Sequence, residues 1–275
     1  MPVLFVSDYI GPVLREALSD RGFSFADGTG WIRVVSDDPL VVLTGLGAAR
    51  APHAPRTSAI TRLNGLAASR TIRSLTTVDL PVGVRSLAAL AGVSPGSVSK
   101  LLATLVAEGI VDRDSRGTVT RVRRRALLRR WVVDYSFAKT NRSVGYYIAP
   151  RGLDRTLERL EDVPGVAITG SAAARRLLPA SSTSIVPMRL LAVYAARPAD
   201  VVRDLRLIDS DPGTANVVIA RPQDAAILAT SDTSSLLTAP TALVIADLLT
   251  LPGRSDAEAE QLMDALAAHE DLWRE

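Results

Sequence analysis

The sequence predicts an α+β protein of three parts, and three observations lead to this prediction. Stretches with helical and strand periodicity alternate along the 275 residues, of which 47% are hydrophobic, enough to build packed cores. A proline-bearing segment at residues 48–56 separates the first fifty residues from the remainder. The middle of the chain is basic, whereas both flanks are acidic. We therefore predict a small α/β domain at 1–50, a middle domain at 57–122, a linking helix at 123–143 and a larger α/β domain at 144–275.

The first fifty residues combine one amphipathic helix with short strands. Residues from Asp8 to Arg21 carry apolar side chains at helix spacing, and Gly22 is suited to end that helix. Strands are predicted at residues 3–6, 23–25, 31–35 and 40–43, with turns between them. This order predicts a small α/β unit.

Three helices and a hairpin are predicted in the middle domain. The helices are expected at residues 58–75, 84–91 and 95–108, and the strands at 110–113 and 118–122. Gly92 ends the second helix, while Ser94 and Pro95 are suited to the N-cap and the first position of the third. Two helices joined by a short turn and followed by a basic hairpin form a winged helix-turn-helix.

Two segments of the middle domain resemble known proteins. Residues 86–102, with the sequence SLAALAGVSPGSVSKLL, and residues 105–111, LVAEGIV, resemble the short helix, turn, recognition helix and wing of bacterial winged-helix transcription regulators. The resemblance implies binding of double-stranded DNA, with the helix from Pro95 in the major groove. A winged helix that contacts protein instead of DNA is the alternative.

The phase of the helix at residues 95–108 separates an apolar face from a small, polar one. Val98, Leu101 and Leu105 share the apolar face, and Lys100 lies on the opposite side. Small residues around Lys100 let the helix approach the bases closely, and the wing offers arginines to phosphates. The predicted DNA-binding residues are Arg85, Ser94, Gly96, Ser97, Ser99, Lys100, Thr104, Arg113, Arg116, Arg121 and Arg123.

The charge distribution agrees with this interpretation. Residues 51–150 hold 16 Lys and Arg against 5 Asp and Glu, a net charge of +11, while residues 1–50 and 151–275 carry −2 and −6. A basic stretch between acidic flanks is typical of a nucleic-acid-binding module. A solvated basic face is the alternative, and because 30 of the 32 basic residues are arginine, coding bias contributes to their number.

A further helix is predicted from Arg123 to about Tyr135, in the linking segment. Its arginines, including Arg129 and Arg130, either extend the phosphate-binding surface or form the solvated side of a helix between two domains. The sequence leaves both interpretations open.

The remainder of the chain has alternating strand and helix signals. Strands are predicted at residues 144–148, 165–169, 188–195 and 216–222, and helices at 151–161, 171–178, 199–205, 242–249 and 256–273. Arg189, Tyr194 and Asp247 are interpreted as structural or interface residues, although a ligand pocket there stays possible.

Over most of its length, the chain resembles the bacterial AbiEi-like antitoxin and transcriptional-regulator family of type IV toxin–antitoxin systems. Beside the winged helix, the matching phrases are FADGTGW at 25–31, ITGSAAA at 168–174, LAVY at 191–194, NVVI at 216–219 and APTALVIADLL at 239–249. The resemblance implies DNA binding and, in some members, neutralisation of a nucleotidyltransferase toxin.

The sequence gives little support for a catalytic or metal-binding site. The chain has no cysteine and only two histidines, His53 and His269, which are poorly placed for a zinc site or a serine triad. A Mg²⁺ nuclease site could draw on four carboxylates of the first domain, but the strands carry no lysine and turns explain most of these residues: Asp8, Asp27, Asp37 and Asp38. The paired glycines 28/30 and 45/47 lead into no Gly-Lys-Ser/Thr sequence. We expect no enzyme, no cofactor and no metal.

The sequence therefore favours a bacterial, sequence-specific regulator of transcription that binds double-stranded DNA, acts as a repressor and forms a homodimer. The alternative is an antitoxin that neutralises a toxin protein by direct contact. A cytoplasmic location without membrane contact is expected, because no basic n-region opens the chain and the longest apolar run, residues 239–251, is too short to span a bilayer.

Overall fold

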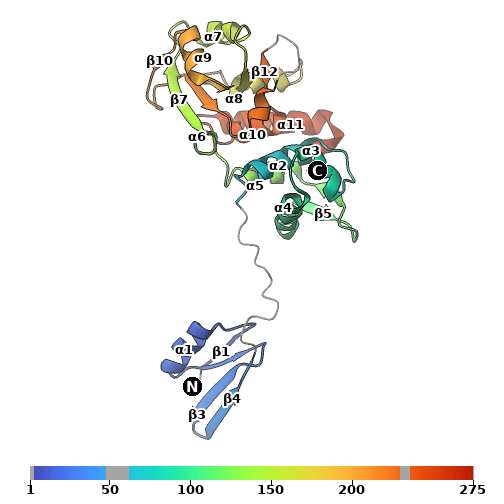
Figure 1. Cartoon of the computed structure of the whole chain (residues 1–275), viewed down its shortest axis with the longest axis vertical. Coiled ribbons are helices and arrows are strands. Elements are labelled where there is room, and N and C mark those ends of the chain that lie inside the picture. Colours follow the sequence, from blue (N-terminus) through green and yellow to red (C-terminus); the bar gives the residue numbers. More distant parts are fainter. Residues whose placement is uncertain (1–2, 48–61, 230–235, 275) are drawn as a thin grey trace. The chain divides into compact units, whose positions relative to one another are not determined.

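The computed structural model of the chain describes residues 3–47, 62–229 and 236–274 (Figure 1). The chain divides into two compact units, Met1–Ile60 (unit 1) and Thr61–Glu275 (unit 2). The proline-bearing segment predicted at 48–56, with His53, lies outside the described residues. So do the first four residues of the helix predicted from Ser58.

Unit 1 is a four-stranded sheet with one helix. Its elements are β1 (Leu4–Ser7), α1 (Pro12–Asp20), β2 (Ser24–Asp27), β3 (Ile32–Asp37) and β4 (Leu40–Gly45). The strands lie in the order β1-β2-β3-β4, with β1 parallel to β2 and the other neighbours antiparallel.

Local residues set the ends of these elements. Helix α1 begins at Pro12, not at Asp8 as predicted, because a proline without an N–H fits the first helical turn and favours extended backbone before it. Gly22 follows the helix with a φ of 72°, as predicted. The Asp27 carboxylate accepts hydrogen bonds from the backbone amides of Thr29 and Trp31 at 2.9 and 3.1 Å, which makes it a turn residue.

The first part of unit 2 has the predicted order of helices and hairpin. Its elements are α2 (Leu66–Thr77), α3 (Val84–Ala91), α4 (Pro95–Ala107), β5 (Val111–Arg113), β6 (Val119–Val122) and α5 (Arg124–Trp131). Helix α2 begins at Leu66, after the extended Gly65, so the prediction of helix through residues 62–65 is wrong. A glycine is a poor residue for a helix interior and a tolerated one at the N-cap. We call residues 62–131 the winged-helix part.

The rest of unit 2, which we call the C-terminal part, is a six-stranded mixed sheet with helices. Its strands lie in the order β10-β7-β11-β9-β8-β12. Three neighbouring pairs in this sheet are antiparallel: β10/β7, β7/β11 and β9/β8. Two pairs are parallel: β11/β9 and β8/β12. The strands are β7 (Ser143–Ile148), β8 (Val166–Thr169), β9 (Leu191–Ala195), β10 (Ile208–Asp209), β11 (Val217–Arg221) and β12 (Leu237–Thr238). The helices are α6 (Phe137–Thr140), α7 (Leu153–Leu160), α8 (Gly170–Leu177), α9 (Pro198–Leu205), η1 (Ala225–Leu228), α10 (Thr241–Leu248), α11 (Ser255–His269) and η2 (Asp271–Trp273).

One continuous hydrophobic core joins the two parts of unit 2. Helix α10 is buried from Ala242 to Leu248 and contacts both α8 and β8 of the C-terminal part and α2 and α5 of the winged-helix part. Figure 1 shows α10 and α11 between the sheet and the winged-helix part. Trp131, at the end of α5, belongs to this core and is 0% exposed. The winged-helix part and the sheet of the C-terminal part therefore share one core.

A buried polar cluster lies within this core. Asp247 of α10 is 0% exposed. Its carboxylate accepts hydrogen bonds from the hydroxyls of Tyr135, Thr169 and Tyr194, at 2.6, 2.6 and 2.8 Å. Asp247 and Tyr194, interpreted from the sequence as structural or interface residues, are thus structural neighbours.

Neither a single membrane-spanning helix nor a metal-binding cluster occurs among the described residues. No one helix there is both long and apolar enough to cross a membrane, although α3 and α4, which bend sharply at their junction, pass that test as a pair on length and composition. No group of three or more His, Cys, Asp and Glu side chains suited to a metal ion occurs among residues 3–47, 62–229 and 236–274.

Candidate nucleic-acid interface

The turn between α3 and α4 is set by a glycine and a serine. Gly92 ends α3 in the left-handed conformation, with a φ of 60°. Ser94 caps α4: its hydroxyl oxygen accepts from the amide of Ser97 at 3.2 Å, and Pro95 takes the first helical position. The axes of α3 and α4 differ by 112°, within the range of a helix-turn-helix.

Helix α4 presents the predicted polar face to solvent. Val98, Leu101 and Leu105 are buried against the rest of the winged-helix part. The predicted residues that are exposed on this helix or its cap are Ser94, Gly96, Ser97, Ser99 and Lys100. This face has small side chains and a single cation, so its backbone can lie close to a major groove.

Thr104 does not belong to that face. It is 3% exposed, and its hydroxyl donates to the backbone oxygen of Lys100 at 3.4 Å. The prediction that Thr104 flanks the exposed face is therefore wrong, because Thr104 follows Leu101 by three residues and so lies on the same side of the helix.

The β5–β6 hairpin forms the wing. The Asp114 carboxylate accepts from the amides of Arg116 and Thr118 at 2.9 and 2.8 Å, which orders the turn. Arg113 donates from Nε to the backbone oxygen of Gly117 at 2.7 Å, so its side chain lies along the hairpin. Arg116 and Arg121 are exposed. The wing thus carries two guanidinium groups that face solvent.

Arg123 lies at the base of the wing. It donates to both carboxylate oxygens of Asp112, at 3.0 and 3.1 Å, and to the backbone oxygen of Gly109 at 2.8 Å. The bond from Arg123 holds the pKa of Asp112 below its usual value. Arg123 is therefore engaged in holding α4, the hairpin and α5 together. Arg85, on α3, is exposed.

The arginines of α5 pair with the acidic C-terminal part. Arg125 contacts Glu260 at 2.9 Å and also pairs with Asp264, and Arg129 contacts Glu260 at 3.0 Å. Both acidic residues lie on α11. The acidic flank noticed in the sequence thus neutralises part of the basic middle.

Other arginines of the basic middle also have structural partners. Arg130 bridges Glu108 and Asp134, at 2.8 and 2.9 Å. Arg124 is buried and donates to the backbone oxygens of Thr76 and Leu272, which anchors the end of the chain to α2. The positive charge available to a ligand is therefore smaller than the net charge of the segment indicates, and within the predicted interface it comes from the exposed Arg85, Lys100, Arg116 and Arg121.

Comparison with known proteins agrees with this geometry. Residues 59–131 match the family described as the Crp-like helix-turn-helix domain. No curated protein and no solved structure matches the chain. The AbiEi-like resemblance is not confirmed by these comparisons. The matched segment ends with α5 and contains every residue of the predicted interface, so the chain carries a Crp-like helix-turn-helix domain, as a DNA-binding regulator of transcription does.

Proposed function

We propose that the protein is a repressor of transcription that binds a specific double-stranded DNA site with α4 and the β5–β6 wing. The observation that carries this proposal is the exposed polar face of α4, beside a wing with two solvent-facing arginines, inside a Crp-like helix-turn-helix segment. Helix α4 reads base edges in the major groove, and the wing contacts phosphates.

Repression requires only that the protein occupy a promoter, so DNA binding by this interface is sufficient for it. We propose no catalytic activity for the protein. A homodimer that binds two half-sites one helical turn apart adds the specificity that a single small helix lacks. Footprinting on DNA selected by the purified protein, followed by a reporter assay of the selected promoter, tests the proposal. An increase in transcription on binding, or no selected DNA, contradicts it.

The wing should supply sequence-independent affinity. Replacing both Arg116 and Arg121 with Ala should weaken binding to cognate and random DNA alike, because phosphates carry no sequence information. The slope of log K against log salt should flatten by about 0.9 for each phosphate that the variant no longer neutralises. Fluorescence anisotropy over a salt series measures this slope.

A matched control removes two exposed arginines elsewhere. Arg151 and Arg155 flank the start of α7 and are exposed. Figure 1 shows α7 far from the wing in unit 2. The Arg151→Ala, Arg155→Ala double variant should keep the wild-type slope. If the two double variants behave alike, net charge and not the wing controls binding.

Lys100 should contribute to specificity. Lys100→Ala should cost about 1–3 kcal/mol on the cognate site and much less on random DNA, because a bidentate or direct contact with guanine is available only at the right base. The matched control is Lys139→Ala, which removes the only other lysine of the chain, an exposed residue of α6. Competition assays with cognate and scrambled duplexes give both affinities. Equal losses on both duplexes show that Lys100 is a phosphate contact only.

A further inference from the structure

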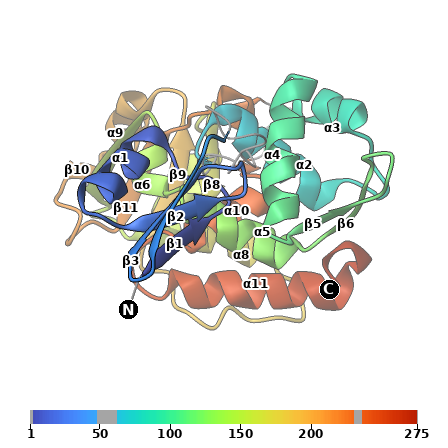
Figure 2. The ribbon, with the colours of Figure 1, turned by 90° about the horizontal axis from the view of Figure 1, so that it is seen from below.

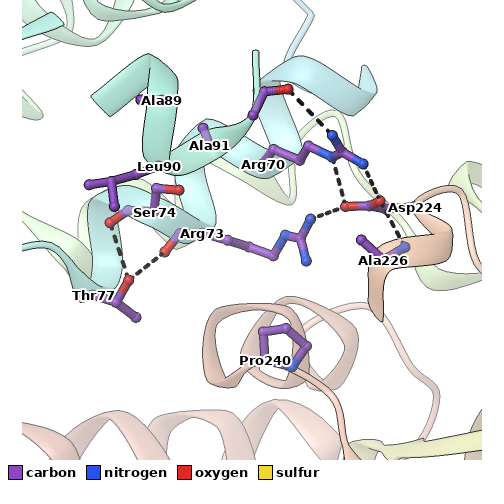
Figure 3. Close-up of a pocket in the computed structure, with 11 residues that line it drawn as sticks. Arg70, Arg73, Ser74, Thr77, Ala89, Leu90, Ala91, Asp224, Ala226 and Pro240 are labelled. Carbon is purple, nitrogen blue, oxygen red and sulfur yellow. Dashed lines mark hydrogen bonds and ion pairs between the residues drawn. The ribbon is translucent and has the colours of Figure 1, made fainter. Parts of the chain in front are cut away.

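An open groove lies where the winged-helix part meets the C-terminal part (Figure 3). Its volume is about 430 Å³, and its walls come from α2, the end of α3, η1 and the start of α10. The side chains that carry charge are Arg70 and Arg73 of α2 and Asp224, which precedes η1. Leu90, which is 64% exposed, and Pro240 are apolar residues of the lining, and they lie on different sides of Arg73 (Figure 3).

Two guanidinium groups converge on one carboxylate in this groove. Arg70 donates from Nε and Nη2 to the two oxygens of Asp224, at 3.0 and 2.8 Å, and Arg73 pairs with the same carboxylate. Asp224 is 3% exposed. Burial raises the pKa of Asp224, but the bonds and charges of the two arginines outweigh burial and hold the pKa below its usual value. Asp224 is therefore ionised, and a net charge of +1 remains on the three side chains.

The donors of the two arginines exceed what Asp224 can accept. Nε of Arg73 is buried and has no hydrogen-bond partner among the described residues. A buried donor without a partner is costly, so the site gains from a group that can accept from it. Among the described residues, those that line the groove include no further acidic one. Both the charge and the donor excess favour an anion.

We propose that this groove binds the carboxylate or phosphate group of a small molecule, whose apolar portion lies against Leu90 and Pro240. Planar guanidinium groups suit both oxyanions, because they offer parallel N–H donors. The oxyanion takes the donors of Arg70 and Arg73 that face the groove, and it competes with Asp224 for them.

Arg70 also connects the groove to the proposed DNA-binding helix, α4. Nη1 of Arg70 donates to the backbone oxygen of Gly92, at 3.4 Å, in the turn between α3 and α4. An anion that draws Arg70 away from Asp224 therefore acts on the turn that positions α4. This regulatory step rests on the proposed DNA-binding function, whereas anion binding itself does not.

Calorimetric titration of the full-length protein with inorganic phosphate, at constant pH and ionic strength, tests the site. Wild type should bind phosphate saturably, and Arg73→Gln should bind it about tenfold more weakly, a change that corresponds to about 1.4 kcal/mol. The control is Arg197→Gln, which removes one exposed arginine of a local pair with Asp200 and should leave phosphate binding unchanged. Sodium acetate as a second probe distinguishes a site for carboxylates from one for phosphates.

A second variant, Asp224→Asn, should change phosphate affinity in the direction opposite to Arg73→Gln. Asp224→Asn removes the competing carboxylate, so it should lower the thermal midpoint without phosphate and bind phosphate more tightly than wild type. Phosphate should then restore the midpoint, and adding Arg73→Gln should abolish this rescue.

Three results overturn the proposal: no saturable phosphate or acetate binding by wild type, equal binding by wild type and Arg73→Gln, or no rescue of Asp224→Asn. If Arg73→Gln instead loses DNA affinity while wild type binds no small anion, the groove contacts the DNA backbone. If phosphate binds and DNA does not, the anion site stands and the proposed function fails.

Discussion

The stability of unit 2 should fall by about 4 kcal/mol between about pH 4 and pH 7 through a single group, Asp247. Burial raises the pKa of Asp247 from 3.8 to about 7, and the hydrogen bonds from Thr169, Tyr135 and Tyr194 only partly oppose this shift. The carboxyl is 0% exposed, and the partners that hydrogen-bond to it in the described part of the chain are three hydroxyls and no cation. Its ionised form is therefore costly in the folded state.

The sign of the effect follows from proton binding. Between the two pKa values the folded protein holds a proton on Asp247 that the unfolded chain releases. The folded state is thus favoured below about pH 4, and this advantage is lost as pH rises through about 7, with a slope of at most about 1.4 kcal/mol per pH unit. Burial also raises the pKa of Tyr135 and Tyr194 well above the usual value, so both stay protonated in this window.

Urea unfolding at a series of pH values from about 5 to about 7.5 measures the effect, above the range in which the other carboxylates titrate. The control is Asp247→Asn, which keeps the shape and offers an oxygen to the same hydroxyls but does not titrate. Its free energy of unfolding should change less with pH than that of wild type. Parallel profiles for the two proteins would mean that Asp247 is not protonated in the folded state.

Local patterns in the sequence predicted most elements of the fold, and the elements that they missed are short. Periodicity located α3, α4 and α9, and the capping residues Gly92 and Ser94 placed the turn of the helix-turn-helix. The two-residue strands β10 and β12 and the four-residue helix α6 are too short for any period to appear. Pairing with β7 and β8 defines β10 and β12, whereas α6 is a single turn closed by local backbone hydrogen bonds to Ser136.

In the candidate site too, the sequence predicts some features, whereas contacts between residues far apart in the sequence determine others. The exposed face of α4 follows from helical phase, so the sequence located Lys100 and Ser97 correctly on it. Thr104 is buried because it follows Leu101 by three residues, so the same helical phase, applied to this position, places it away from the exposed face. The ion pairs of Arg125 with Glu260 and of Arg70 with Asp224 join residues 135 and 154 positions apart. A net charge counted along the sequence therefore overestimated the cationic surface.

The stability of both parts of unit 2 should depend on Trp131. It is 0% exposed in the shared core, and its ring lies 4.8 Å from that of Tyr135. Trp131→Ala should lower the free energy of unfolding by about 3–5 kcal/mol, because a large cavity opens where α5 ends beside the C-terminal part. Figure 2 shows α4 and the hairpin at one end of unit 2 and α9 and β10 at the other.

The loss of stability in Trp131→Ala should therefore reach both ends of unit 2. Amide hydrogen exchange can measure the loss at each end separately. Amides of α4 and of β9 should lose protection by the same factor in Trp131→Ala, because a continuous core unfolds as one cooperative body. Trp131→Phe is the matched control. It keeps most of the apolar volume and removes a buried indole N–H that has no hydrogen-bond partner among the described residues, so its cost should stay below about 1.5 kcal/mol. Loss of protection confined to α4 and the hairpin would show instead that the winged-helix part unfolds independently of the sheet.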